Sequence, residues 1–228
     1  MTLDSEKQAA AQASMRFVQD GNIVGLGSGS TAAYVVRFLA ERVRAGLKIR
    51  CIPTSNDTHE LAASLGIPLT TLDEFQSIDV TIDGADEIDP QLDLIKGGGA
   101  AFLREKIVAS ASRQLVIVAD SSKLVPVLGK VPLPVEVIPF AQALVAKEIA
   151  ALGDTVSIRR DSSGKPWTTD EGHHILDCHF GRIPDAPALA RALEDIPGVV
   201  AHGLFIHMAN VALVGKDSGV QELHAPQS

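Results

Sequence analysis

Residues 23–31 read Ile-Val-Gly-Leu-Gly-Ser-Gly-Ser-Thr, and this stretch decides how the chain begins to fold. Its first four residues form a short apolar run typical of a buried strand, and a helical pattern follows over about 31–44. The glycines let backbone N–H groups approach an anion closely, and a helix start adds partial positive charge. Hydroxyls of Ser28, Ser30 and Thr31 can add donors. The stretch predicts an anion site, with a tight turn and a Ser/Thr cap as the alternative.

The alternation of strand and helix continues through the first half of the chain. Each polar motif follows the carboxyl end of a predicted strand, which is the edge where open α/β sheets bind ligands. This pattern predicts a Rossmann-like, doubly wound and mostly parallel sheet. The further strands are expected at 49–53, 78–82 and 115–119, and the further helices at about 4–20, up to 65, and at 99–112.

The pattern changes at the Val-Pro-Leu-Pro stretch of residues 131–134. Beyond it the order is β-α-β-β-α-β, the ferredoxin-like arrangement, and a last strand at 211–214 could return to the first sheet. We expect a Rossmann-like catalytic domain at 1–130 plus 208–228 and a smaller α/β domain at 131–207. The elements of the smaller domain are expected at 135–138, 140–152, 155–160, 174–178, 186–195 and 199–207.

An acidic turn, Asp-Gly-Ala-Asp-Glu at residues 83–87, ends one of the predicted strands. Gly84 and Ala85 suggest that the backbone there approaches something small. A solvated turn is the alternative. A metal site is conceivable because hard cations take carboxylates, but the spacing does not match a calcium loop.

Lys96-Gly97-Gly98-Gly99 is a second candidate anion site, made of N–H groups and one ammonium. In the helix that follows, burial among apolar neighbours would raise the pKa of Glu105 toward a value useful for a general base. The same holds roughly for Arg104 and Lys106, so the pattern leaves an ion pair open as the alternative. The one-turn neighbours of Glu105 are Ala101, Phe102, Val108 and Ala109.

A further lysine, Lys123, closes the stretch Asp-Ser-Ser-Lys after the next strand, where a simple turn and cap is the alternative. A zinc site at the histidines is not expected, because alternation along a strand would point His173 and His174 to opposite faces. Together the carboxylates, lysines and glycine loops suit acid–base chemistry on a small anionic substrate.

Bulk properties exclude several classes of function. The 228 residues are 46% hydrophobic and 21% charged with a net charge of −8, and no block of Lys or Arg indicates a nucleic-acid partner. No stretch approaches the roughly 18 apolar residues of a membrane span, and no signal-type segment follows the start. Cys51 and Cys178 lie in apolar strand-like runs, which favours a reducing, cytoplasmic location. NAD is disfavoured because Ser30 and Thr54 replace the glycine and acid of the dinucleotide fingerprint.

The chain closely resembles the ribose-5-phosphate isomerase A family over nearly its whole length. The stretches that carry the resemblance are Gly25-Leu26-Gly27-Ser28-Gly29-Ser30-Thr31-Ala32, Asp83-Gly84-Ala85-Asp86-Glu87-Ile88, Lys96-Gly97-Gly98-Gly99-Ala100-Ala101, Arg104-Glu105-Lys106-Ile107-Val108-Ala109 and Leu133-Pro134-Val135-Glu136-Val137.

The resemblance implies reversible conversion of ribose 5-phosphate to ribulose 5-phosphate, with no metal and no cofactor. It implies that Glu105 is the base that moves a proton between C1 and C2 through an enediolate. It also implies that Asp83 and Lys96 handle the sugar oxygens, with Asp83 a candidate for assisting ring opening. Lys7 and Lys123 are expected to hold the phosphate. The implied substrate-binding residues are Lys7, Ser28, Gly29, Ser30, Thr31, Asp83, Gly84, Ala85, Asp86, Lys96, Gly97, Gly98, Gly99 and Lys123.

The resemblance also implies a Rossmann-like domain with a smaller lid, and a homodimer or homotetramer. One segment departs from the family pattern: residues 207–210 read His-Met-Ala-Asn where relatives tend to carry an Asn-Arg pair and an Asp. Two alternatives remain, a CoA-transferase-like enzyme with a glutamate nucleophile and a sugar-phosphate-sensing module. A sensing regulator should carry a DNA-binding segment, and the sequence shows none.

Overall fold

The computed structural model describes residues 2–153, 155–217 and 219–225 and divides them into two compact units. The first unit contains the described residues up to Ala85, residues 104–123 and the described residues from His207 onward; the second contains 86–103 and 124–206. Residues 86–103 and 124–130 thus group with the second unit. The domain limits expected from the sequence stay a prediction, because compactness alone does not show independent folding.

A six-stranded sheet forms the centre of the first unit, in the order β13-β12-β6-β3-β1-β2. Neighbouring strands are parallel except β12 and β13, which pair antiparallel at one edge. The predicted mostly parallel sheet is confirmed, and β12 is the predicted returning strand. The strands are β1 (Ile23–Leu26), β2 (Arg50–Pro53), β3 (Val80–Asp83), β6 (Leu115–Asp120), β12 (Val211–Lys216) and β13 (Gly219–His224).

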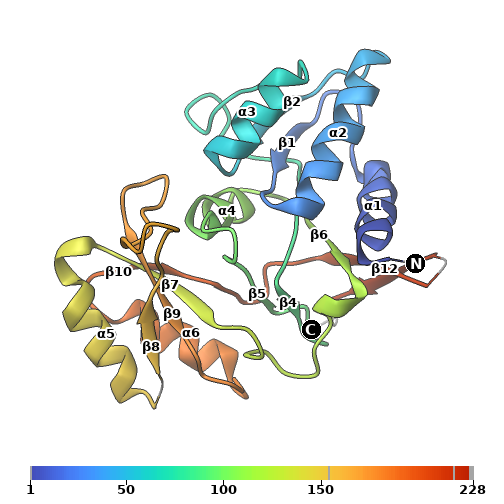
Figure 1. The fold of residues 1–228 in the computed structure, drawn as a ribbon. Helices are drawn as coiled ribbons and strands as arrows, with labels where there is room; N and C mark the ends of the chain where they lie inside the picture. The colour runs from blue at the N-terminus through green and yellow to red at the C-terminus, as the bar shows by residue number, and fades with distance from the viewer. Residues whose placement is uncertain (1, 154, 218, 226–228) are drawn as a thin grey trace. The chain divides into compact units, whose positions relative to one another are not determined.

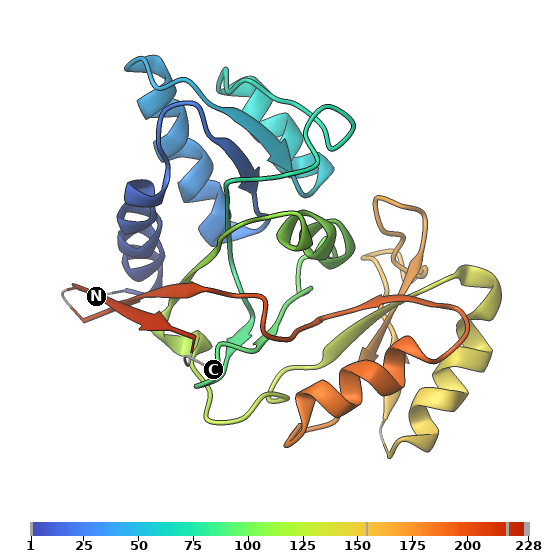
Figure 2. The ribbon, with the colours of Figure 1, turned by 180° about the vertical axis from the view of Figure 1, so that it is seen from behind.

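Helices cover both faces of this sheet. Because side chains alternate along a strand, Val24 and Leu26 of β1 face a core shared with α1 (Leu3–Ser14) and α2 (Ser30–Arg44), which lie side by side (Figure 1). Figure 2 shows the same pair from behind. Gly25 faces the other way, where a Cβ would lie 2.7 Å from a methyl carbon of Val108 in α4. The remaining helical segments of the unit are α3 (Asn56–Ser64), η1 (Met15–Phe17) and η2 (Ser121–Lys123).

Helix α4 spans Phe102–Ser110 and begins later than the predicted start at residue 99. Gly97 and Ala100 have φ angles of 110° and 64°, in the left-handed region that a right-handed helix excludes. The stretch of glycines is therefore a shaped loop before the helix rather than its first turn.

The second unit holds a four-stranded sheet in the order β10-β7-β9-β8, with antiparallel neighbours. This order and the two crossover helices make the ferredoxin-like arrangement that the sequence predicts. The elements are β7 (Leu133–Val137), η3 (Pro139–Ala141), α5 (Gln142–Ala151), β8 (Val156–Ile158), β9 (His174–Cys178), α6 (Ala186–Glu194) and β10 (Val199–His202).

A separate three-stranded sheet in the second unit was not expected from the sequence. It joins β4 (Glu87–Ile88), β5 (Leu94–Ile95) and β11 (Leu204–Phe205). The strand predicted at 199–207 is therefore wrong in extent, since β10 and β11 belong to different sheets. They part at Gly203, where a side chain would overlap the Lys96 carbonyl oxygen.

In the ranges that the structure describes, no helix is both long enough and apolar enough to cross a bilayer.

Candidate active site

The carboxyl ends of β1 and β3 meet at the point where the order of strands reverses. The chain runs from β1 outward to β2 and then returns to β3 on the other side of β1. Loops that diverge at such a switch point leave a crevice in which α/β sheets bind ligands. The first glycine loop follows β1 and the acidic turn follows β3, so the fold itself brings these two motifs together.

Asp83 is the best-defined side chain at this edge. It is buried, and its Oδ1 accepts hydrogen bonds from the N–H groups of Ser28 (3.1 Å) and Gly84 (2.7 Å). Gly27 lies against it so closely that any side chain there would overlap the carboxylate. Two backbone donors and one close glycine thus fix the orientation of the Asp83 carboxylate.

The hydroxyl of Ser28 belongs to a polar network under the loop. Its Oγ lies 2.9 Å from Thr54 Oγ1, 2.7 Å from Ser55 Oγ and 3.2 Å from Thr58 Oγ1. Thr58 Oγ1 also donates to the Gly27 carbonyl (3.1 Å). Ser28 therefore anchors the loop, and a ligand would meet its hydroxyl only in competition with these three partners.

Gly29 to Thr31 form the start of α2. Gly29 has φ 92° and no side chain to cap the helix, so the backbone N–H groups of the first turn are oriented to receive an anion. Ser30 is exposed, Thr31 is buried, and the Lys7 ammonium lies 3.2 Å from Ser30 Oγ. The structure thus brings Lys7 to the first glycine loop.

Lys123 lies on η2, which directly follows the carboxyl end of β6. The first residue of η2, Ser121, donates its N–H (2.9 Å) and its hydroxyl (2.7 Å) to Glu6 Oε2. These bonds lower the pKa of Glu6 and tie η2 to the helix that carries Lys7. Lys7 Nζ also lies 4.0 Å from Asp120 Oδ2. The two predicted phosphate lysines therefore sit on elements that are bonded to each other.

Glu105 occupies the first turn of α4. The end of α4 bonds to Ile78 at the amino edge of the sheet, and Val108 packs on Gly25 in the middle of β1. Glu105 is one turn earlier, so it lies toward the carboxyl edge, on the face where Thr81 and Asp83 point. Among the three charged residues 104–106, Glu105 alone is buried, at 5% exposure.

The second unit holds the other predicted residues, Asp86 and the loop Lys96–Gly99. Asp86 Oδ2 accepts a hydrogen bond from the Gly98 N–H (2.8 Å), which joins the acidic turn to the second glycine loop. Lys96 is buried, with its Nζ 5.4 Å from the centre of the Phe205 ring. A Cβ at Gly97 would lie 2.6 Å from atoms of Phe102 and Pro134, so the loop requires glycine there for space as well as for φ.

The histidines have separate partners. His173 Nδ1 lies 3.0 Å from Glu136 Oε1, whereas His174 Nδ1 lies 2.6 Å from Gln142 Oε1. Burial raises the pKa of Glu136, although hydrogen bonds from Thr169 and His173 oppose the effect. Among the described residues, no three His, Cys, Asp or Glu side chains are grouped to hold a metal ion.

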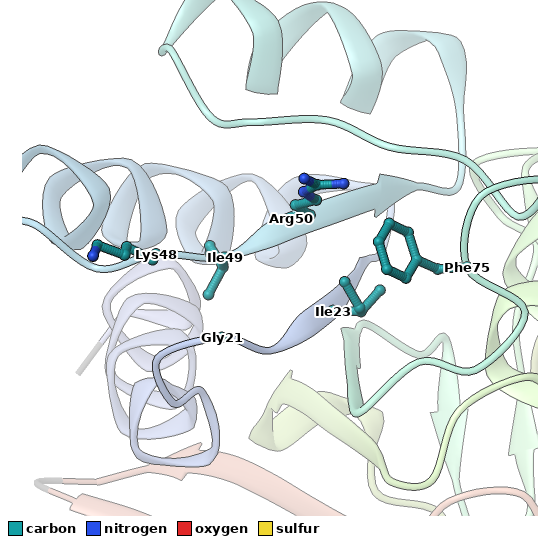
Figure 3. Close-up of a pocket in the computed structure, with 6 residues that line it drawn as sticks. All are labelled: Gly21, Ile23, Lys48, Ile49, Arg50 and Phe75. Atoms are coloured by element: carbon teal, nitrogen blue, oxygen red, sulfur yellow. The ribbon is translucent and has the colours of Figure 1, made fainter.

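A pocket of about 280 Å³ lies at the opposite, amino edge of the six-stranded sheet (Figure 3). It is lined by Gly21, Ile23, Lys48, Ile49, Arg50 and Phe75. Its position beside the starts of β1 and β2 separates it from the first glycine loop, which follows the carboxyl end of β1. We therefore do not assign the acid–base chemistry to this pocket.

Sequence reasoning missed several residues that shape the site. The hydroxyls of Thr54, Ser55 and Thr58 follow β2, and their nearness to Ser28 could have been inferred from the pairing of β1 with β2. Glu6 gave no signal beyond its position beside Lys7. Asn210, in the atypical segment, accepts a hydrogen bond from the Leu115 N–H at the start of β6 (2.7 Å), at the amino edge of the sheet.

Comparison with known proteins gives consistent matches. The family model described as ribose 5-phosphate isomerase A (phosphoriboisomerase A) matches residues 50–219. Ribose-5-phosphate isomerase A of Parvibaculum lavamentivorans is 52% identical over 99% of this chain and 100% of its own length. The solved ribose 5-phosphate isomerase A of Methanocaldococcus jannaschii is 40% identical, covers 98% of this chain and all of its own, and has a TM-score of 0.94. A D-ribose-5-phosphate isomerase in complex with phospho-erythronic acid is 38% identical over 98% of this chain and all of its own, with a TM-score of 0.96.

Proposed function

We propose a mechanism for this chain on the premise that it belongs to the ribose 5-phosphate isomerase A family. It interconverts ribose 5-phosphate and ribulose 5-phosphate, an aldose–ketose isomerisation. The roles of individual residues are our proposal. It rests chiefly on the burial of Glu105 at the edge where Asp83 is fixed by two backbone donors.

Glu105 is the proposed base. It takes the proton from C2 of the open-chain aldose, and the electron pair forms the C1–C2 double bond of an enediolate. Within the enediolate the proton of the C2 hydroxyl passes to the C1 oxygen, so the negative charge passes to the C2 oxygen. Glu105 then returns the carbon proton to C1 while the C2 oxygen becomes a carbonyl and the C1 oxygen remains a hydroxyl. One carboxylate can serve both half-reactions because the two carbons are neighbours.

Lys96 and Asp83 are proposed to act on the sugar oxygens. Lys96 stabilises the negative charge as it moves from the C1 oxygen to the C2 oxygen. In the loop Gly97–Gly99, the N–H groups of Gly97 and Gly99 add backbone donors, while the Gly98 N–H stays bonded to Asp86. Asp83 assists ring opening by accepting the proton of the anomeric hydroxyl as the bond between C1 and the ring oxygen breaks, and by passing that proton to the ring oxygen. Gly84, Ala85 and Asp86 then complete the substrate-binding turn.

The phosphate is proposed to bind Lys7, Lys123 and the start of α2 at Ser28–Thr31. Hydrogen bonds to a charged phosphate are about twice as strong as neutral ones, and α2 adds its dipole. The relative bound to phospho-erythronic acid supports this class of ligand, since that compound combines a phosphate with a carboxylate that resembles an enediolate.

The family assignment does not favour the alternatives. Matches that cover nearly the whole of this chain and of the relatives leave no part of the chain to be explained by a CoA-transferase or a sensing module. We further propose a homodimer or homotetramer, which sedimentation equilibrium would distinguish from a monomer. A cytoplasmic location is also proposed, supported by the burial of Cys51 and Cys178 as thiols.

The test is formation of ribulose 5-phosphate from ribose 5-phosphate in the presence of EDTA. We expect turnover by the wild type and a fall in kcat of roughly 10²- to 10⁴-fold for Glu105→Gln, the usual contribution of a general base. Glu148→Gln, on the exposed face of α5, is the matched control and should match the wild type. Near-wild-type kcat for Glu105→Gln would remove Glu105 from the role of base. If the wild type turns over without EDTA but not with it, the metal-free mechanism is contradicted.

A further inference from the structure

Arg159, in the second unit, contacts the loop that carries Lys96, yet sequence reasoning did not select it. Its Nη1 donates to the Gly97 carbonyl oxygen at 2.8 Å, and the Gly98 carbonyl oxygen lies 3.4 Å away. It follows directly on β8, and its backbone N–H donates to Ile175 in β9 (2.9 Å). Arg159 is thus held by the four-stranded sheet and binds the loop that follows β5 of the three-stranded sheet.

The Arg159 guanidinium is held in place from its other side by Asp177. Its Nε donates to Asp177 Oδ2 at 3.0 Å, and Nη2 donates to Asp177 Oδ1. Both side chains are largely buried, at 17% and 20% exposure. A two-point pair of this kind fixes the plane of the guanidinium, so the remaining donor keeps its aim at Gly97.

The loop needs such support because its backbone is unusual. Ala100 has φ 64°, a conformation that residues with a Cβ rarely adopt and that persists only where the surroundings enforce it. Asp86 binds the Gly98 N–H on one side, and Arg159 binds the Gly97 carbonyl on the other. The Ala100 N–H also donates to that carbonyl (3.0 Å). Two charged side chains therefore bind the two polar ends of one peptide group, the one that joins Gly97 to Gly98.

We infer that Arg159, oriented by Asp177, is a positioning residue that holds the Lys96–Gly99 loop in the geometry needed for isomerisation. The inference rests on the proposed role of that loop. Arg159 acts through the loop backbone and has no chemical step of its own. Its contribution falls on kcat more than on KM, because the proposed phosphate ligands Lys7 and Lys123 lie in the first unit.

The test compares Arg159→Ala with Arg160→Ala. Arg160 is the next residue, is exposed, and donates to the Gly164 carbonyl (2.7 Å), so its removal should leave kinetics unchanged. For Arg159→Ala we expect kcat to fall roughly 10- to 100-fold with a change in KM of less than about threefold, as for a small misplacement of a catalytic group. Millimolar guanidinium should restore part of the lost kcat to Arg159→Ala and none to Arg160→Ala.

Two further variants keep the inference open to refutation if Arg159→Ala does not fold. Arg159→Lys keeps the charge but cannot bind Asp177 and Gly97 together, so its kcat should lie below the wild type. Asp177→Asn keeps the arginine and loosens its orientation, so we expect a smaller loss that falls on kcat. Wild-type kcat in either folded variant would overturn the inference, as would an equal loss of kcat in Arg160→Ala.

Hydrogen exchange separates this inference from the proposed function. Amides of residues 97–100 should exchange faster in Arg159→Ala than in the wild type or Arg160→Ala, whatever the enzyme turns over. If the wild type does not isomerise ribose 5-phosphate, the proposed function fails while this result can still stand. If the wild type is active and exchange at 97–100 is unchanged in Arg159→Ala, the positioning role is wrong.

Discussion

At the scale of single residues, burial separates the candidate catalytic groups from their neighbours. Arg104 donates to Asn56 of α3 (2.9 Å) and Lys106 is half-buried, whereas Glu105 is almost fully covered. The sequence shows three charged residues in a row on an apolar helix and cannot rank them. The ranking follows from how α4 packs on Gly25 and Thr81, which depends on contacts between distant parts of the chain.

The proposed phosphate site gives a prediction at this scale. Lys123→Ala should raise KM for ribose 5-phosphate about 10-fold or more, since a lost hydrogen bond to a charged group is worth roughly 1.5–3 kcal/mol. The effect on kcat should be small, because the phosphate does not react. Steady-state kinetics with Lys130→Ala, an exposed lysine nearby in sequence, is the matched comparison. An unchanged KM would take Lys123 out of the phosphate site.

The site residues differ in how far the sequence could predict them. Glycine loops and acidic turns are readable because few residues tolerate a φ of 92° or an approach as close as that of Gly27 to Asp83. Arg159 gave no such signal, because an arginine in a strand is usually a solvated side chain. Its importance depends on the approach of a loop that lies 62 positions earlier in the sequence.

At the scale of elements, α1 is docked by close backbone contact as well as by apolar packing. Gly215 of β12 lies directly beneath Glu6, where any side chain would overlap the helix backbone. Ala10 and Ala11 are fully buried against the same face. Small residues on both elements thus allow α1 to approach the sheet closely and to carry Lys7 to the edge of the site.

Glu6 makes this docking dependent on pH. Two hydrogen bonds from Ser121 lower the pKa of Glu6 below its usual 4.5, and the bond from the Ser121 N–H has a larger effect than the bond from its hydroxyl. The folded state therefore favours the carboxylate, so the stabilisation is present above pH 4.5 and is lost as pH falls through the lowered pKa. Glu6→Gln should have a lower Tm than the wild type at pH 7.

Thermal unfolding of Glu6→Gln between pH 7 and pH 3 tests this expectation. The difference in Tm should shrink as the pH falls, while Glu41→Gln, at an exposed position in α2, should follow the wild type throughout. A difference that is constant over this range would mean that the Glu6 charge is not the cause.

Element types were largely predictable and their ends were not. The topologies of the six-stranded and four-stranded sheets follow from alternating strand and helix patterns, whose periods of 2 and 3.6 are visible in the sequence. The start of α4 and the break at Gly203 depend instead on backbone angles and on contact with the Lys96 carbonyl oxygen. The short strands β4 and β5 have only two residues each, too few for a period to be recognised.

At the scale of the whole molecule, the chain passes between the two compact units four times, at residues 85–86, 103–104, 123–124 and 206–207. If the second unit unfolds, its two segments become flexible loops whose ends are held by the folded first unit. The entropy cost of closing such a loop grows only slowly with its length, so these connections do not prevent the two units from unfolding separately. The sequence-based limits of 1–130 plus 208–228 and 131–207 therefore remain our proposal for two domains. Each unit contains one buried cysteine, which allows separate unfolding to be measured.

Both thiols should be unreactive in the native protein. Cys51 in β2 and Cys178 in β9 are fully buried, and burial raises the pKa of Cys51 to about 12, which leaves almost no thiolate at neutral pH. Labelling of Cys51→Ala and Cys178→Ala in rising urea then reports each unit separately. We expect Cys178 to become reactive at lower urea than Cys51, because a smaller domain buries a smaller share of its surface. Coincident midpoints would show that the two units unfold as one, and the proposed domain limits would then have no thermodynamic meaning.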